Sequence, residues 1–333
     1  MENKVKRIGV LTSGGDAPGM NAAVRAVVRT AVSHGIQCVG IRRGWNGLIN
    51  GDILPLDAGS VRSIINRGGT MLYTARSEEF RTEEGQKKAA NTCKLLGLDG
   101  IVAIGGDGTF RGALALSRQA AEAGEHLSVV GIPATIDNDI GCSHYTIGFD
   151  TACNTAIECI DKLRDTMQSH ERCSVVEVMG HRAGHLALTV GVACGATAVI
   201  VPEHPVDYEA DLLEPIRRAR LAGRTHFMII VAEGVEGGAY SIGKVIEEAT
   251  ALDTRVTVLG HIQRGGSPSS RDRITATYMG YEAVRLLAEG KTCRVVALQG
   301  ENYVDYDITE ALQMTKSLDQ HTYEVMRALT GVH

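Results

Sequence analysis

A short polar segment, 133–139, carries the residue types with the most chemistry to offer in this chain. It reads Pro-Ala-Thr-Ile-Asp-Asn-Asp and follows a β-branched run that predicts a buried strand over 128–132. The carboxylates of Asp137 and Asp139 stand close enough to repel unless water, a metal ion, a cation or a shared proton offsets their charges. Open α/β sheets bind ligands at the carboxyl ends of their strands. An Asx-rich turn would use the same residues, so the case for a site depends on a second, similar segment.

That second segment is 105–109, Gly-Gly-Asp-Gly-Thr, between a predicted strand at 100–104 and a predicted helix at 110–122. Glycines let the backbone approach a ligand closely, and the free N–H groups at the start of a helix bind phosphate. Mg²⁺ prefers one or two carboxylates together with phosphate oxygens, so Asp107 is the expected magnesium ligand. A plain strand-to-helix turn is the alternative, but we expect phosphate binding.

A third turn, 13–19, has the same setting. It reads Ser-Gly-Gly-Asp-Ala-Pro-Gly between a predicted strand at 7–12 and a predicted helix at 21–34, a layout that aims backbone N–H groups at an anion. The chain has no Gly-x-x-x-x-Gly-Lys-Ser/Thr loop and no Gly-x-Gly-x-x-Gly after a strand. Ordinary P-loop and dinucleotide-binding interpretations are therefore weak.

Strands alternate with helices along the chain, which predicts an α/β fold with mainly parallel sheets covered on both faces. A domain boundary is expected near 140–150, where a long helix follows the segment 133–139. The other expected strands are at 36–41, 173–178, 197–201, 226–232, 256–260 and 294–298, and the other expected helices are at 61–66, 82–96, 151–167, 184–193, 208–222, 242–250, 269–289 and 307–328.

Composition excludes several classes of protein. Of the 333 residues, 44% are hydrophobic and 22% charged, as in a globular enzyme, and no apolar run approaches the ~20 residues of a membrane helix. The net charge of −5 argues against general nucleic-acid binding. Met1 leads directly into a strand with no secretory signal, and the eight cysteines include no Cys-x-x-Cys pair. We therefore expect reduced thiols and a cytoplasmic protein.

Four segments resemble those of the bacterial-type ATP-dependent 6-phosphofructokinases, in the same order and over almost the whole chain: 11–21, 104–109, 133–139 and 260–268. The Gly-Gly-Asp-Gly-Thr string is shared with lipid and NAD kinases, whereas Thr-Ile-Asp-Asn-Asp and the segment 255–273 are much more specific. The resemblance implies two three-layer α/β/α domains of the phosphofructokinase type. The nucleotide-binding domain would comprise 1–145 plus about 262–310, and the sugar-phosphate-binding domain 146–261 plus about 311–333.

The resemblance also implies an activity, a cofactor and an assembly. The γ-phosphoryl group of ATP would pass to O1 of fructose 6-phosphate with Mg²⁺ as cofactor, in a homotetramer whose active sites are shared across an interface. Asp137 is the expected general base for the sugar hydroxyl, and Thr135, Asp139, His181 and Arg182 complete the expected catalytic set. The expected ATP-binding residues are Gly15, Arg76, Ser77, Gly106, Asp107, Gly108 and Thr109. The expected sugar-phosphate residues are Thr135, Asp137, Arg172, Met179, Gly180, His181, Glu233, Arg255, His261 and Arg264, with Arg172 and Arg255 acting across the subunit interface.

Two positions bear on the phosphoryl donor. Relatives that use pyrophosphate typically carry aspartate where this chain has Gly108 and lysine where it has Ala134, so the resemblance favours ATP. Three alternatives stay open: a pyrophosphate- or mixed-donor kinase, an acceptor such as sedoheptulose 7-phosphate or tagatose 6-phosphate, and a non-catalytic regulatory subunit.

One departure from the family pattern touches the reacting groups. His181 stands where the family usually has an arginine that neutralises the transferring phosphoryl group. Histidine is only partly charged near neutral pH. Either His181 acts while protonated, or Arg182 takes its place, or the acceptor differs.

A second departure concerns regulation. The family's effector site keeps several basic residues here but lacks others, because Ala58, Ala222 and Thr225 replace basic residues and Thr197 replaces a glutamate. Each charged hydrogen bond is worth roughly 1.5–3 kcal/mol, so we expect weak or altered control by ADP and phosphoenolpyruvate. The remaining candidate anion-binding residues are Arg25, Arg29, Arg164 and Arg224.

Overall fold

The computed structural model describes residues 5–329, which divide into two compact units. Unit 1 comprises 5–135, 140–150 and 264–316, and unit 2 comprises 136–139, 151–263 and 317–329. The segments 1–4 and 330–333 lie outside the described residues. The expectation that no secretory signal is present depends on the first of these segments. The last passage between the units is at 316–317, whereas the sequence placed it near 310.

The secondary structure has the following bounds. The strands are β1 (Arg7–Thr12), β2 (Gln37–Ile41), β3 (Ile53–Leu56), β4 (Gly100–Gly105), β5 (Ser128–Pro133), β6 (Cys173–Val178), β7 (Ala198–Ile200), β8 (Phe227–Ala232), β9 (Thr254–Val258), β10 (Arg294–Gln299) and β11 (Asn302–Asp307). The helices are α1 (Met20–Ser33), α2 (Gly44–Asn50), η1 (Glu79–Arg81), α3 (Glu83–Leu95), α4 (Asp107–Glu122), α5 (Phe149–His170), α6 (His185–Ala193), η2 (Tyr208–Leu213), α7 (Glu214–Leu221), α8 (Gly238–Thr250), η3 (Gly260–Arg264), α9 (Ser270–Ala288), α10 (Ile308–Ala311) and α11 (Gln320–Leu329).

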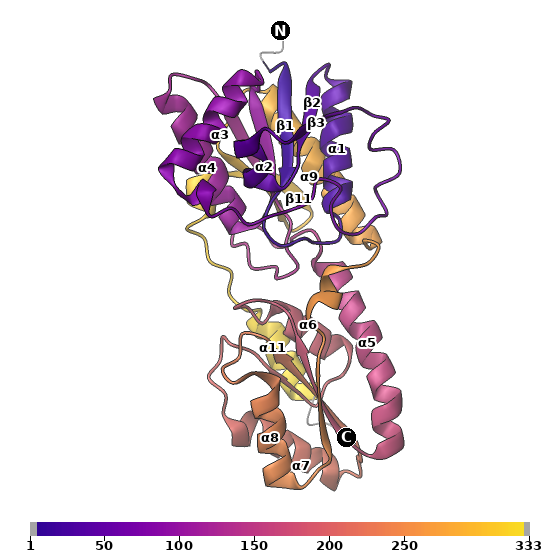
Figure 1. The fold of residues 1–333 in the computed structure, drawn as a ribbon. Coiled ribbons are helices and arrows are strands. Elements are labelled where there is room, and N and C mark those ends of the chain that lie inside the picture. Colours follow the sequence, from indigo (N-terminus) through magenta and orange to yellow (C-terminus); the bar gives the residue numbers. More distant parts are fainter. Residues whose placement is uncertain (1–4, 330–333) are drawn as a thin grey trace. The chain divides into compact units, whose positions relative to one another are not determined.

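Unit 1 is built on a seven-stranded sheet with the order β11-β10-β5-β4-β1-β2-β3. Its central pairs are parallel, and only the outer pairs β2–β3 and β10–β11 are antiparallel among the described strands. The helices α1 and α9 lie on one face, and α2, α3 and α4 lie on the other (Figure 1). The strands β4 and β5 are buried along their whole length, which is the pattern of central parallel strands covered on both faces.

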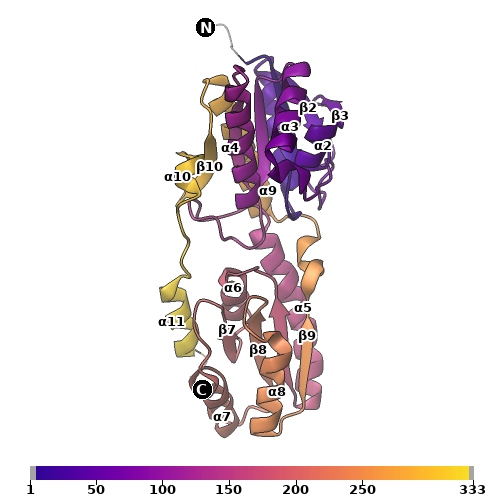
Figure 2. The same ribbon diagram turned by 60° about the vertical axis from the view of Figure 1, so that its left-hand side comes forward.

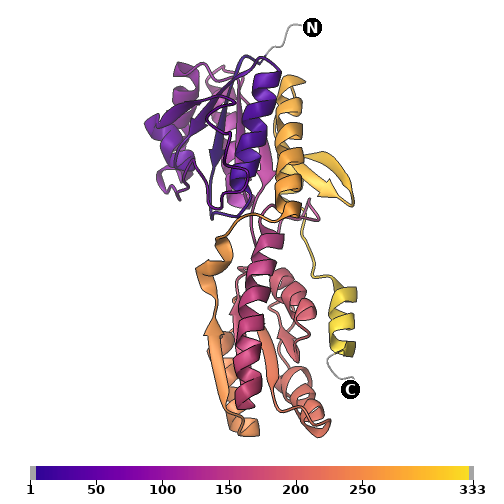
Figure 3. The ribbon, with the colours of Figure 1, turned by 90° about the vertical axis from the view of Figure 1, so that its right-hand side faces the viewer.

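The helices α1 and α9 lie side by side (Figure 3). Small residues allow this close approach, because a Cβ at Gly280 would lie 2.6 Å from the Cβ of Ala26.

Unit 2 is built on a parallel four-stranded sheet with the order β7-β8-β6-β9. The helix α8 packs on β9, β6 and β8, and α6 packs on β7, β8 and the C-terminal helix α11 (Figure 2). The predicted α/β class with mainly parallel sheets is confirmed by both units. None of the helices within 5–329 combines the length and apolarity needed to cross a bilayer.

Two local predictions were wrong, and some elements were not predicted. The segment 61–66, predicted as a helix, forms turns, while the helix α2 and the strand β3 were not predicted. The segment 307–328 was predicted to be helical throughout, but its first residue ends β11 and 312–319 separate the helices α10 and α11. The strand β11 exists because it pairs with the neighbouring strand β10, a tertiary effect that overrides local propensity.

The eight cysteines are free thiols, and six of them are buried. Burial raises the pKa of Cys38, Cys93 and Cys173 to about 12, so these side chains behave as small apolar groups in the two cores.

Candidate active site

Two glycine-rich turns of unit 1 meet at the carboxyl ends of neighbouring strands. The strands β1 and β4 pair in parallel up to Thr12 and Ile104, and the turns 13–15 and 105–109 follow them. The Ser13 N–H donates to the Ile104 carbonyl at 3.0 Å, and the Thr109 hydroxyl donates to the Ser13 carbonyl at 3.1 Å. A Cβ at Gly105 would lie 2.3 Å from Thr109 Oγ1 and 2.4 Å from Ser13 O, so only glycine permits this contact.

The same point is where the strand order of the sheet reverses. The chain leaves β1 toward β2 on one side and leaves β4 toward β5 on the other. The helices α1 and α4 therefore begin on opposite faces of the sheet, and the crevice between their N-termini is the usual ligand site of such sheets. Side chains do not crowd the second turn, because a Cβ at Gly106 or Gly108 would meet nothing within 4 Å. The arrangement suits a chain of phosphates.

Asp107 is the first residue of the 16-residue helix α4, and it is exposed. A carboxylate is favoured at the positive end of a helix. Mg²⁺ takes hard oxygen ligands and often uses one protein carboxylate together with phosphate oxygens, so Asp107, between two glycines with open space beside them, fits the expected ion. No group of three or more histidine, cysteine or acidic side chains within 5–329 forms a metal site by itself.

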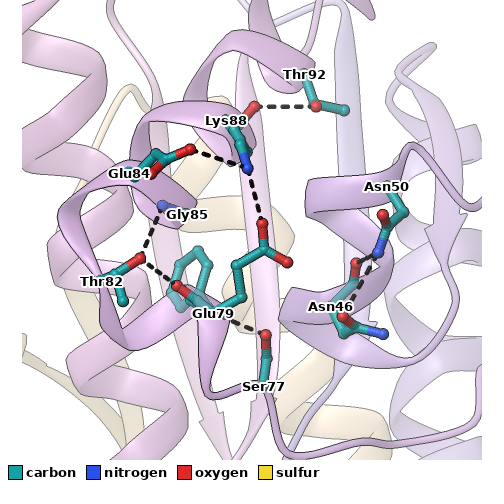
Figure 4. A network of polar contacts seen from close by, with 10 residues as sticks. Asn46, Asn50, Ser77, Glu79, Thr82, Glu84, Gly85, Lys88 and Thr92 are labelled. Atoms are coloured by element: carbon teal, nitrogen blue, oxygen red, sulfur yellow. Dashed lines mark hydrogen bonds and ion pairs between the residues drawn. The ribbon is translucent and has the colours of Figure 1, made fainter.

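The loop that carries Arg76 and Ser77 returns to the first glycine turn. The Thr74 hydroxyl donates to the Gly14 carbonyl at 2.6 Å. The Ser77 hydroxyl accepts from the Phe80 N–H at 3.2 Å, and the Thr82 side chain caps α3 by accepting from the N–H of Gly85 (Figure 4). Arg76 is exposed. The expected ATP-binding residues are thus brought to one edge of unit 1.

The acidic segment 133–139 begins in unit 1 and continues in unit 2. Its first part is held by the loop 146–147: the Ile147 N–H donates to the Pro133 carbonyl at 3.1 Å, and the Thr146 hydroxyl donates to the Thr135 carbonyl at 2.6 Å. Ile136–Asp139 belong to unit 2. Asp137 is half-buried and Asp139 exposed. Between them, Asn138 has φ 52°, a left-handed conformation that asparagine tolerates well.

Two loops of unit 2 bring some of the expected sugar-binding residues together, namely Met179, Gly180, His181 and Glu233. The His181 N–H donates to Glu233 Oε1 at 2.6 Å. The residue after Glu233 is a glycine whose Cβ would lie 2.5 Å from the His181 carbonyl. Gly180 and His181 both have positive φ, 141° and 56°. The loop 179–182 is therefore bent sharply over Glu233, with exposed side chains at His181 and Arg182.

Sequence reasoning missed Gln263. Its side chain is fully buried, its Oε1 accepts from the Met179 N–H at 3.3 Å and its amide donates to the Gly260 carbonyl at 3.1 Å. A glutamine between apolar and basic neighbours gives no local sign of burial. Gln263 joins the loop 179–182 to η3, which carries His261 and Arg264.

Arg172 and Arg255 lie together but at the other end of the sheet. Asp253 binds both: Arg172 Nε at 2.5 Å and an Arg255 Nη at 3.0 Å. They stand at the amino ends of β6 and β9, whereas Glu233 follows the carboxyl end of β8. A strand rises ~3.3 Å per residue, so about 20 Å separates the two ends. The structure does not bring these arginines to the Glu233 loop of the same chain.

Arg264 lies on the first glycine turn. One of its terminal nitrogens donates to the Asp16 carbonyl at 3.1 Å, and a Cβ at Gly15 would lie 2.5 Å from the same nitrogen. His261 is exposed on η3. In the division of the chain into two compact units, Gln263 is the last residue of this part of unit 2 and Arg264 begins the next part of unit 1.

The four candidate effector arginines form one pair in each unit. On α1, burial lowers the pKa of Arg25 and the positive charge of Arg29 lowers it further. In unit 2, burial lowers the pKa of His226, and so do the nearby guanidinium groups of Arg164 and Arg224. Each pair concentrates positive charge that an anion would neutralise.

Comparison with known proteins gives a consistent picture. The sequence pattern of the family described as Phosphofructokinase matches residues 7–287. A protein of Clostridium botulinum (strain Hall) named ATP-dependent 6-phosphofructokinase is 54% identical over 327 residues, 98% of this chain and 100% of the relative. One of Clostridium novyi (strain NT) with the same name is 53% identical over 326 residues, again 98% of this chain and 100% of the relative.

Solved structures agree on the fold. The phosphofructokinase of Saccharomyces cerevisiae superimposes with a TM-score of 0.90 at 35% identity, covering 98% of this chain. This chain spans about half, 48%, of that longer chain. A pyrophosphate-dependent phosphofructokinase from Marinobacter aquaeolei superimposes with a TM-score of 0.84 over 99% of this chain and 92% of its own, but at 19% identity it shows the fold alone.

Proposed function

Because the chain belongs to the phosphofructokinase family, we propose that it is an ATP-dependent 6-phosphofructokinase. It phosphorylates fructose 6-phosphate at O1 to give fructose 1,6-bisphosphate, a reaction of glycolysis. The observation that carries the proposal is the pair of glycine turns joined at the switch point of the unit 1 sheet, with the Asp107 carboxylate at the start of α4.

The donor binds to unit 1 in this proposal. The backbone N–H groups of the two turns hold the phosphates, and Asp107 holds Mg²⁺, which when bound neutralises phosphate charge. The open space at Gly108 supports ATP over pyrophosphate, because it leaves room for the rest of a nucleotide. The ATP-binding residues are Gly15, Arg76, Ser77, Gly106, Asp107, Gly108 and Thr109.

Most of the acceptor-binding residues belong to unit 2, and Thr135 and Arg264 belong to unit 1. Asp137 takes the proton from the sugar O1 hydroxyl as general base, beside Thr135 and Asp139. Glu233 binds sugar hydroxyls, and its contact with the His181 N–H fixes the loop that carries Met179, Gly180, His181 and Arg182. Protonated His181, or Arg182, offsets charge on the transferring phosphoryl group. His261 and Arg264 bind the sugar 6-phosphate, and reaction requires the two bound substrates to meet.

Arg172 and Arg255 complete the sugar-phosphate site of a neighbouring subunit. Their place at the far end of the unit 2 sheet supports this, because within one chain they lie about 20 Å from the Glu233 loop. The enzyme is then a homotetramer with shared active sites that works in the cytoplasm. The pair Arg25 and Arg29 of unit 1 and the pair Arg164 and Arg224 of unit 2 each bind effector anions, and the response to ADP and phosphoenolpyruvate is weak or altered.

Measuring donor and acceptor preferences side by side tests the function. We expect turnover with Mg-ATP and fructose 6-phosphate well above that with pyrophosphate, or with sedoheptulose 7-phosphate or tagatose 6-phosphate as acceptor. A preference for pyrophosphate or for another acceptor would replace the proposed reaction, and no turnover with any combination would indicate a non-catalytic protein.

A further inference from the structure

Tyr73 is an exposed aromatic residue on an unfavourable backbone conformation. Its side chain is 56% exposed, and its φ of 56° lies in the left-handed region that bulky residues rarely adopt. Glycine or asparagine would hold the same turn with less strain. Such strain persists only where surrounding contacts impose it, and it concentrates at ligand sites.

The contacts that impose it come from the phosphate-binding edge of unit 1. The Thr12 hydroxyl, at the end of β1, donates to the Tyr73 carbonyl at 2.8 Å, and the Tyr73 N–H donates to the Thr70 carbonyl at 3.2 Å. The next residue, Thr74, donates to the Gly14 carbonyl at 2.6 Å. The backbone of Tyr73 is therefore fixed, and the residue after it contacts the first glycine turn.

One face of the ring is covered by an arginine. The guanidinium carbon of Arg43 lies 5.4 Å from the ring centroid, within cation–π range. Arg43 is itself fixed, because its N–H donates to the Leu72 carbonyl at 2.8 Å and its side chain pairs with Asp52. The contact with Arg43 thus orients the ring, while Tyr73 stays more than half exposed to solvent.

We propose that Tyr73, oriented by Arg43, is the stacking surface for the purine base of the phosphoryl donor. An open aromatic face binds any nucleobase by stacking, and the adjacent glycine turn would hold the phosphates of the same molecule. The inference rests on the proposed function, since pyrophosphate has no base to stack. A merely structural tyrosine would not need an exposed ring on a strained turn.

Variants at position 73 test this by separating the ring from the backbone. Tyr73→Phe keeps the ring, and Tyr73→Asn removes it while keeping a residue that accepts positive φ. We expect Tyr73→Asn to weaken ADP binding and raise the KM for ATP about 5- to 100-fold, the range for loss of one base stack. Tyr73→Phe should stay within about 2-fold. The KM for fructose 6-phosphate and the affinity for tripolyphosphate, which lacks a base, should not change in either variant.

A matched control is Tyr240→Ala, which removes a 70% exposed tyrosine from α8 of unit 2 and should leave all these constants unchanged. The inference would be overturned if Tyr73→Asn bound ADP as tightly as the unmodified enzyme does. It would also be overturned if Tyr73→Asn lost as much affinity for tripolyphosphate as for ADP. Failure of the proposed function looks different, because the unmodified enzyme would then not use ATP at all.

Discussion

Replacing Asp272 with alanine should destabilise unit 1 strongly. Asp272 is fully buried near the start of α9, and its Oδ1 accepts from the Tyr145 hydroxyl and from the Gly148 N–H, both at 2.6 Å. These groups belong to the loop that also holds the Pro133 and Thr135 carbonyls. Asp272 therefore fixes the loop behind the acidic segment.

The magnitude follows from these contacts. A hydrogen bond to a charged group contributes roughly 1.5–3 kcal/mol, and removal of the acceptor leaves buried donors without it. Loss of two such bonds predicts a decrease of about 3–6 kcal/mol in the free energy of unfolding. Tyr145→Phe removes one of them and should cost about 1.5–3 kcal/mol.

The sole tryptophan, Trp45, provides the assay. It is buried in unit 1 and stacks on Phe80 with a centroid distance of 4.7 Å, so its fluorescence reports unfolding of that unit. For a unit of this size, the expected loss corresponds to a midpoint lower by roughly 6–24 °C. A midpoint for Asp272→Ala within ~2 °C of the unmodified protein would refute the reasoning, and so would a larger loss for Tyr145→Phe.

Four further predictions follow from the same structure. Asp137→Asn should lower kcat at least ~10²-fold with little change in ADP affinity; retained turnover would exclude Asp137 as the base. If His181 acts while protonated, His181→Arg flattens the dependence of activity on pH, whereas an unchanged profile counts against that role. Gly105→Ala should push the two glycine turns apart and lower the free energy of unfolding by about 1–3 kcal/mol. Gly106→Ala is the control, because a Cβ there meets nothing within 4 Å, and its thermal midpoint should stay near that of the unmodified protein. Burial and two arginines lower the pKa of His226 below that of the unfolded chain. The free energy of unfolding should therefore fall as pH drops below about 6.5. The variant His226→Gln should lessen that loss. Added phosphate should raise the pKa of His226 measured by NMR.

Much of the fold and of unit 1's candidate site could be predicted from local patterns. The buried strands are continuous apolar runs, and the helices after them begin at glycine turns, so the order of elements and the turn around Asp107 were visible in the sequence. The failures share a cause. The strand β11 forms only because β10 is beside it, and Gln263 is buried only because Met179 offers it an N–H.

By itself, the sequence determined which residues carry charge and where the backbone can bend, because residue type and neighbouring residues decide both. Only the tertiary structure decided which of those residues meet. It brought the Ser13 and Gly105 turns into contact across β1 and β4 and set Arg264 against Gly15. It also placed Arg172 and Arg255 at the opposite end of their sheet from Glu233. The physical reason is that strand pairing and its register join residues that are far apart in the chain. No local sequence pattern specifies which distant residues become neighbours.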